Sequence, residues 1–163
     1  MTPADNARKV LHEFSEASGI EDLTVDEDNR AFLLFQNEYG LFIEVSEEKA
    51  LLMLSSSLGT PNVPDEAALF RLLLTVNGLW RDNAITFGIE PQSGYVMQMC
   101  ALPAADLTLE RFQQALANHI EALATFQAIV DGDGQAGQAV AAEAQGGEEA
   151  DVDPADMTSA IRV

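Results

Sequence analysis

The residues that could perform chemistry are few, and their spacing brings none of them together. The two histidines, His12 and His119, fall in separate expected helices, and the single cysteine, Cys100, has no histidine or carboxylate near it in the sequence, as a zinc site would require. The serine run at 55–57 lacks the sharp turn or neighbouring base that activates a nucleophile. The sequence therefore predicts no catalytic centre, no metal site and no cofactor.

The segment Asp131-Gly132-Asp133-Gly134 resembles the start of a calcium-binding loop. Such a loop needs a third acidic ligand, which is missing here, and a glutamate at its twelfth position, where this chain has Ala142. Gly146-Gly147 is followed by two glutamates, which would repel a nucleotide. We therefore expect neither calcium nor a nucleotide to bind these segments.

The charge of the chain excludes several classes of partner. Its 163 residues include 27 acidic residues and only eight Lys and Arg, a net charge of −19. Nucleic acids and anionic membranes attract clustered basic residues, which this chain lacks. No apolar run approaches the roughly 20 residues of a membrane-spanning helix, and the N-terminus has no signal-peptide pattern. We expect a soluble cytoplasmic protein without nucleic-acid binding or membrane insertion, and the single cysteine fits a reducing compartment.

Hydrophobic periodicity and turn residues divide the first 130 residues into eight elements. The expected helices cover 3–18, 65–76 and 108–130, and the expected strands cover 30–36, 41–46, 50–57, 84–90 and 95–102. This is an α+β fold in the order α-β-β-β-α-β-β-α, with antiparallel strands packed on helices. Residues 131–163 hold eight acidic residues, one basic residue and no aromatic residue, so we expect an acidic, disordered tail after a single domain over 1–130.

The first three strands are apolar on both faces, whereas a half-buried strand should alternate. A four-residue loop from Asn37 to Gly40 would set Phe35 opposite Phe42, and a turn at 46–49 would set Phe42 opposite Met53. The face suited to helices would then hold Phe32, Leu34, Leu41, Ile43, Val45, Leu52 and Leu54. The other face would hold Leu33, Phe35, Phe42, Leu51 and Met53. That second face is either a partner site or another buried layer, and both interpretations remain open.

The helix at 65–76 is apolar around its whole circumference, with only Arg71 and Thr75 polar after its first turn. Such a helix must be buried on all sides. Because a sheet in so small a domain covers one side, the sequence predicts that a second subunit covers the other. The expected homodimer interface consists of Leu69, Phe70, Leu72, Leu73 and Val76. It is centred either on Leu69, Leu72, Leu73 and Val76 or on the opposite edge of the helix, with Phe70 and Leu74.

Three segments, "LFRLLLTVNGLW", "ITFGIEPQSGYVMQMCALP" and "LTLERFQQALANHIEALATF", carry a family resemblance over about residues 1 to 130. With the order of elements and the acidic charge, they resemble the class I chaperones of type III secretion systems. The segments match that family's leucine-rich helix ending in Asn, its glycine-containing strand pair, its "LP" and its long final helix. The acidic tail and sparsely charged helix faces are similar to those of broad-specificity chaperones of plant-associated bacteria.

The resemblance implies a virulence-related homodimer that binds the extended N-terminal segment of secreted effector proteins and keeps them secretion-competent without ATP. It implies a dimer interface on the second helix and adjoining strand, with the secretion-system ATPase as a further candidate partner. It also implies that apolar patches on the first helix and the strands hold the client. The client-binding candidates are Val10, Phe14, Leu33, Phe35, Phe42, Leu51 and Met53.

Two other classes of function remain open from the sequence. The chain could be a dimeric interaction or regulatory module without an unfolded client. It could also be an enzyme whose site comes from a cofactor that the sequence does not reveal.

Overall fold

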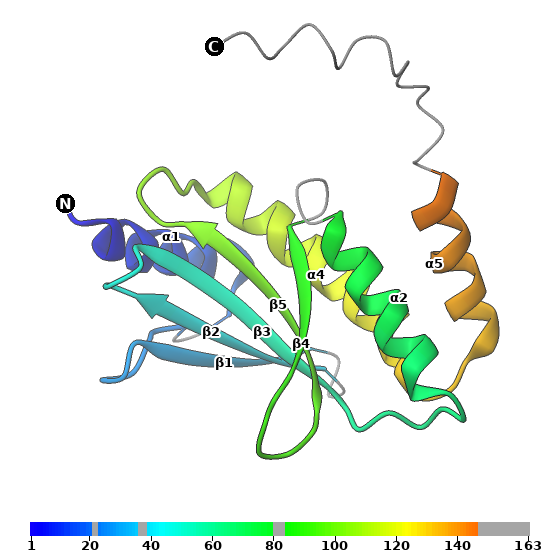
Figure 1. Cartoon of the computed structure of the whole chain (residues 1–163). Coiled ribbons are helices and arrows are strands. Elements are labelled where there is room, and N and C mark those ends of the chain that lie inside the picture. The colour runs from blue at the N-terminus through cyan, green and yellow to red at the C-terminus, as the bar shows by residue number, and fades with distance from the viewer. Residues whose placement is uncertain (21–22, 36–38, 80–83, 147–163) are drawn as a thin grey trace, which may run out of the picture.

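The computed structural model describes residues 1–20, 23–35, 39–79 and 84–146. Its elements follow the predicted order and add one helix after it (Figure 1). They are α1 (Pro3–Ser18), β1 (Arg30–Phe35), β2 (Tyr39–Ser46), β3 (Leu51–Gly59), α2 (Glu66–Gly78), β4 (Ile85–Ile89), β5 (Val96–Pro103), α4 (Leu109–Val130) and α5 (Gly134–Gly146). The α+β prediction is confirmed.

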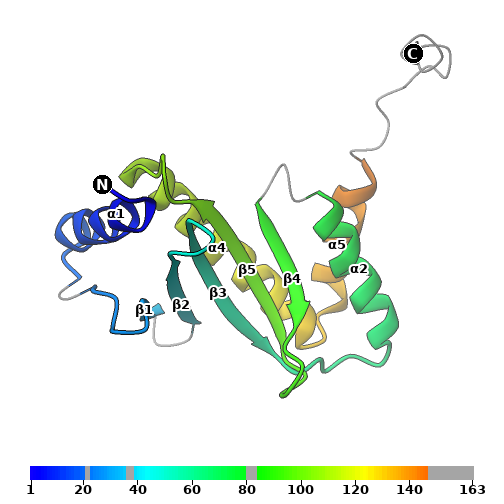
Figure 2. The same ribbon diagram turned by 60° about the vertical axis from the view of Figure 1, so that its left-hand side comes forward.

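The strands form one antiparallel sheet in the order β1-β2-β3-β5-β4. Helices α1 and α4 cover one face of this sheet, while α2 and α5 stand together beyond β4 (Figures 1 and 2). We call the face under α1 and α4 the inner face and the opposite one the open face. Each strand alternates between them, so its burial alternates as well.

Local signals explain where the helices begin. Thr2 accepts a hydrogen bond from the Asp5 amide and the Asp5 carboxylate accepts one from the Thr2 amide, which forms a capping box before Pro3. Thr108 caps α4 through the amide of Arg111. The Asn6 side chain donates to the Ala104 and Leu107 carbonyls at 2.9 Å, which fixes α1 against the loop that precedes α4.

The inner face is packed by two hydrophobic clusters, and α4 contributes to both. In the first, Phe14 of α1 meets Phe112 of α4 edge to face, with 5.1 Å between ring centroids. In the second, Phe87 of β4 meets Phe126 of α4 at 4.4 Å. Because burying one such ring contributes about 1.5 to 3 kcal/mol, these contacts are a main source of stability.

The β1–β2 register differs from the sequence prediction. The structure pairs Phe35 with Tyr39 and Phe32 with Phe42, so Tyr39 and Gly40 belong to β2 and not to the predicted loop from Asn37 to Gly40. The rest of that loop lies outside the described residues. Compared with the predicted pair of Phe35 and Phe42, the observed pairing is a shift of three residues, and an odd shift turns a strand over. Phe32 and Leu34 therefore lie on the open face. Leu33 and Phe35 lie on the inner face, contrary to the prediction.

The β2–β3 register also differs, by two residues, because Phe42 pairs with Ser55 and Met53 pairs with Glu44. An even shift leaves every side chain on its predicted face. Phe42, Leu51 and Met53 therefore lie on the open face, as the sequence predicts.

The composition of 131–163 predicts disorder, but the structure has helix α5 over Gly134–Gly146, packed on α2 and α4. Gly132 permits the reversal, because its φ is +102° and a β-carbon there would lie 2.8 Å from the Asn62 carbonyl oxygen. The Asp133 carboxylate accepts from the amides of Gln135 and Ala136 at the start of α5. Val140 and other small side chains supply the apolar contact. Residues 147–163 lie outside the described residues.

Between the two hydrophobic clusters, three polar side chains are fully buried: Ser56 of β3, Gln98 of β5 and His119 of α4. The Ser56 Oγ and His119 Nε2 lie 3.1 Å apart, and Gln98 Nε2 donates to the His119 carbonyl at 2.7 Å. Burial lowers the pKa of His119 from 6.5 to about 4. A Ser-His pair suggests a nucleophile, but this one has no exposed atom with which to meet a substrate.

We predict that replacing Val140 by Asp destabilises the fold, because Val140 packs against the second cluster. The expected loss in the free energy of unfolding is about 1 to 2 kcal/mol, measured by urea denaturation. Ala139→Asp, at the exposed neighbouring position, is the matched control and should change stability by less. Equal effects of the two substitutions would show that α5 does not pack as described.

We also predict that acid weakens the fold through His119. The folded protein keeps this imidazole neutral down to about pH 4, whereas the unfolded chain protonates it near pH 6.5. The contribution of neutral His119 to the free energy of unfolding is therefore fully present above pH 6.5. It falls by about 3 kcal/mol as the pH drops toward 4. Unfolding of His119→Gln should lack this part of the pH dependence, and exposed His12→Gln should retain it. Identical pH profiles for all three proteins would contradict the prediction.

Candidate functional site

The open face carries large apolar side chains on β1 and β2. Phe32, Leu34 and Phe42 are 53%, 55% and 50% exposed. Leu51 and Met53 of β3 continue the surface and are half-buried. We call these five residues the open-face patch. Contiguous exposed apolar surface of this kind is typical of partner sites on soluble proteins.

Phe32 and Phe42 form the centre of the patch. They are directly opposite each other in the β1–β2 ladder, and their ring centroids lie 4.9 Å apart at an interplanar angle of 51°. Gly40 makes room for the Phe32 ring, because a β-carbon on Gly40 would lie 3.0 Å from Phe32 Cε2. The rings are therefore held as a preformed pair, which lowers the entropic cost of binding to them.

The outer edge of β1 lies beside the patch. The amide of Val45 donates to the Asn29 carbonyl at 2.9 Å, so the alternate residues Arg30, Phe32 and Leu34 direct their amides and carbonyls away from β2. Asp26 occupies both groups of Arg30, through its amide at 2.7 Å and its carboxylate at 2.9 Å. Within the described residues, nothing occupies these groups of Phe32 and Leu34.

The structure separates the predicted client-binding residues into two groups. Phe42, Leu51 and Met53 belong to the open-face patch, whereas Leu33 and Phe35 pack against the inner cluster. Val10 and Phe14 are 2% and 8% exposed and belong to the core. Sequence reasoning missed Phe32 and Leu34, because β1 has no polar residue inside its apolar run to reveal which face is outward. That the residues of the open-face patch bind a client stays a prediction.

A second apolar surface lies between α2 and β4. Leu74 and Ile89 are 68% and 52% exposed and stand beside a groove of about 320 Å³. The residues lining that groove are Phe70, Leu73, Leu74, Asn77, Phe87, Gly88 and Ile89. We call this region the α2–β4 surface.

The predicted dimer residues divide between this surface and the protein's own core. Leu69, Leu73 and Val76 are buried, and Phe70 and Leu72 are half-buried. Part of the cover that the sequence assigned to a second subunit therefore comes from α5 of the same chain. Leu74, which the sequence places on the alternative edge with Phe70, is the most exposed large apolar side chain of α2.

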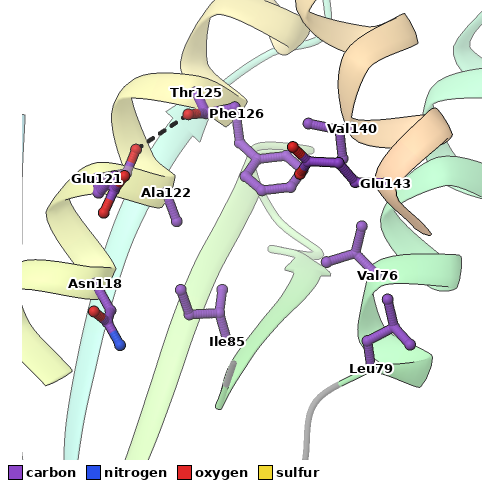
Figure 3. Close-up of a pocket in the computed structure, with 10 residues that line it drawn as sticks. All are labelled: Val76, Leu79, Ile85, Asn118, Glu121, Ala122, Thr125, Phe126, Val140 and Glu143. Carbon is purple, nitrogen blue, oxygen red and sulfur yellow. Dashed lines mark hydrogen bonds between the residues drawn. The ribbon is translucent and has the colours of Figure 1, made fainter. Parts of the chain in front are cut away.

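A third hollow, of about 410 Å³, lies between α2, α4 and α5 (Figure 3). Val76, Ile85 and Phe126 point into it, and Glu121 and Glu143 are exposed at its sides. Thr125 Oγ1 donates to the Glu121 carbonyl at 3.2 Å, a bond within α4. This hollow offers apolar walls and carboxylates, but no nucleophile beside a base.

The histidine, cysteine and aspartate residues that the sequence offered for chemistry lie in structural contacts or at the surface. His12 is exposed beside Glu16, and burial raises the pKa of the Cys100 thiol. Asp133 caps α5, and the Asp131 carboxylate accepts from Gln127. The described part of the chain contains no cluster of three or more potential metal ligands. Among the helices that the structure describes, none combines the length and apolarity needed to cross a bilayer.

The chain is similar in sequence and in fold to known proteins. The transcriptional anti-antiactivator ExsC of Pseudomonas aeruginosa is 30% identical over 142 residues, which is 86% of this chain and 97% of ExsC. The crystal structure of the ExsC-ExsE complex aligns with a TM-score of 0.70 and 29% identity, covering 80% of this chain and 97% of that one. The HopA1-SchA chaperone-effector complex shares the fold, with a TM-score of 0.68 and 17% identity over 76% of this chain and 94% of that one.

A model of the Tir chaperone protein (CesT) family matches residues 9–127. The match runs from α1 to the last turn of α4, and so includes the inner face, the open-face patch and the α2–β4 surface. Helix α5 lies beyond it. The resemblance seen in the sequence is confirmed: this chain belongs to the Tir chaperone protein (CesT) family.

Proposed function

We propose that this protein is a type III secretion chaperone that holds the N-terminal segment of a secreted effector as an extended chain on the open-face patch. The observation that carries the proposal is the exposed Phe32–Phe42 pair beside the unpaired part of the β1 edge. Family membership supports it, and so do the ExsC-ExsE and HopA1-SchA complexes.

The geometry suits an unfolded client. The amides and carbonyls of Phe32 and Leu34 can pair with any extended backbone, while the apolar side chains supply contact area. Each ring removed from water contributes about 1.5 to 3 kcal/mol, so binding needs no ATP. We infer binding without catalysis, in the bacterial cytoplasm. Which effector binds is decided by its apolar side chains.

We further propose that the protein is a homodimer through the α2–β4 surface. Exposed Leu74 stands beside the groove that Phe70, Phe87 and Ile89 help to line. In a two-fold dimer the same patch meets itself, so each Leu74 can enter the groove of the other subunit. This surface and the open-face patch lie at opposite edges of the sheet, which lets two subunits associate without covering the client site.

A second candidate function is regulatory binding, and the name of ExsC as a transcriptional anti-antiactivator favours it. In that case the same surface would hold a folded regulator and not an extended effector. Limited proteolysis of the complex distinguishes the two, because only an unfolded client is cut rapidly outside the segment that the chaperone protects.

We predict that the double substitution of Phe32 and Phe42 by Ser abolishes client binding, because it removes the paired anchor. Tagged protein is recovered from its native bacterium, treated with protease, and the protected segment is identified by mass spectrometry. Wild type and Tyr95→Ser, a matched exposed aromatic outside the patch, should protect the same segment. The fold, measured by far-UV circular dichroism, should survive. Equal protection by the double variant would refute this site.

We predict that Leu74→Asp gives a folded monomer, because Leu74 is exposed within one chain and a charge in an apolar interface is costly. Sedimentation velocity at micromolar concentration should show a dimer for wild type and a monomer for the variant. Leu73→Asp, one residue earlier and buried, should instead destabilise the fold by several kcal/mol, on the order of 2 to 4. A monomeric wild type would rule out the proposed dimer.

A further inference from the structure

The sheet has two edges, β1 and β4, and Asn77 occupies the second one. The Phe87 amide donates to Asn77 Oδ1 at 2.7 Å, and Asn77 Nδ2 donates to the Phe87 carbonyl at 2.9 Å. These are the two backbone groups that an added strand would use at this position. The side chain of Asn77 therefore stands where a residue of a neighbouring strand would stand.

Only a carboxamide can make this pair of contacts so fully, because it carries a donor and an acceptor side by side, as a peptide group does. The position of Asn77 is fixed by the helix that carries it. Leu73 and Val76, in the turn before it, are buried in the same cluster as Ile85 and Phe87 of β4. The amide group is thus held against the strand by packing and not only by its own hydrogen bonds.

The two edges are consequently unequal. On β1, Asp26 occupies the outward groups of Arg30, but within the described chain those of Phe32 and Leu34 have no partner. On β4, the outward groups of the central residue Phe87 are taken. An exposed strand edge accepts any extended chain, including that of another copy. Strand addition at the β1 edge would serve client binding, whereas strand addition at the β4 edge would cause copies of the protein to associate.

We propose that Asn77 is a specificity-determining residue that closes the β4 edge by imitating a strand, so that strand addition is confined to Phe32 and Leu34 of β1. This inference depends on the proposed chaperone function for its purpose, but not for its test. It also implies that the proposed dimer is held by side chains on the α2–β4 surface and not by a sheet that continues from one subunit to the other.

The test uses the full chain without any client. In Asn77→Ala, the Phe87 amide should exchange with deuterium about tenfold faster or more, while the Leu54 amide in the central strand β3 should be unchanged. Sedimentation velocity should show species larger than those of wild type, growing with concentration, because opened β4 edges pair with each other. Thr75→Ala is the matched control, since its hydroxyl donates only to the Arg71 carbonyl within α2.

Unchanged sedimentation of Asn77→Ala would overturn the proposal even if the Phe87 amide exchanged faster, because another group would then close the edge. A measurement on wild type guards against a variant that fails to fold. The Phe87 amide proton and the Asn77 Nδ2 proton that is bonded to the Phe87 carbonyl should both be protected from exchange, and free exchange of either would also overturn the proposal. A client that fails to bind would count against the proposed function alone, since neither measurement involves one.

Discussion

The burial of one face of the sheet against α1 and α4 is the constraint on which the rest of this structure depends. Because successive side chains of a strand point to opposite faces, burying Leu41, Ile43 and Val45 on the inner face sends Phe42 outward. Pairing then sends Phe32 outward beside it. The open-face patch is thus a consequence of how the core is filled, and its two rings need no other support than the β1–β2 ladder.

Helix α4 makes this arrangement a single unit. Phe112 contacts the first hydrophobic cluster and Phe126 contacts the second, while His119 lies between them. Its neutral imidazole lies within hydrogen-bond distance of Ser56, and Gln98 donates to its backbone carbonyl, whereas Gln98 Oε1 and His119 Nδ1 have no hydrogen-bond partner among the described residues. A buried Ser-His pair is here a feature of the core, which explains why a histidine and a serine of this chain approach each other without forming a site.

The two surfaces at either end of the sheet differ in the state of the backbone. At β1 the aromatic pair adjoins backbone groups of Phe32 and Leu34 that can still form hydrogen bonds. At β4 the apolar side chains adjoin backbone groups that Asn77 already satisfies. The first combination suits an extended chain, and the second suits a folded surface that brings side chains only. This difference is the physical ground for proposing a client site at the first surface and a dimer interface at the second.

The sequence by itself determined the order of the eight elements in 1–130 and the apolar character of the strands and of α2, because these follow from local periodicity, caps and turn residues. It also carried the family resemblance, through three of its segments. Only the tertiary structure decided which face of β1 is outward, since an all-apolar strand fits either register until the rest of the sheet is assembled. Only the tertiary structure decided that α5 packs. Ala136 and Val140 have no apolar partner until the chain reverses at Gly132 and returns to α2. The tertiary structure also brought Asn77, at the end of α2, against Phe87 of the edge strand β4. These residues meet through the packing of α2 on β4, which no local sequence pattern encodes.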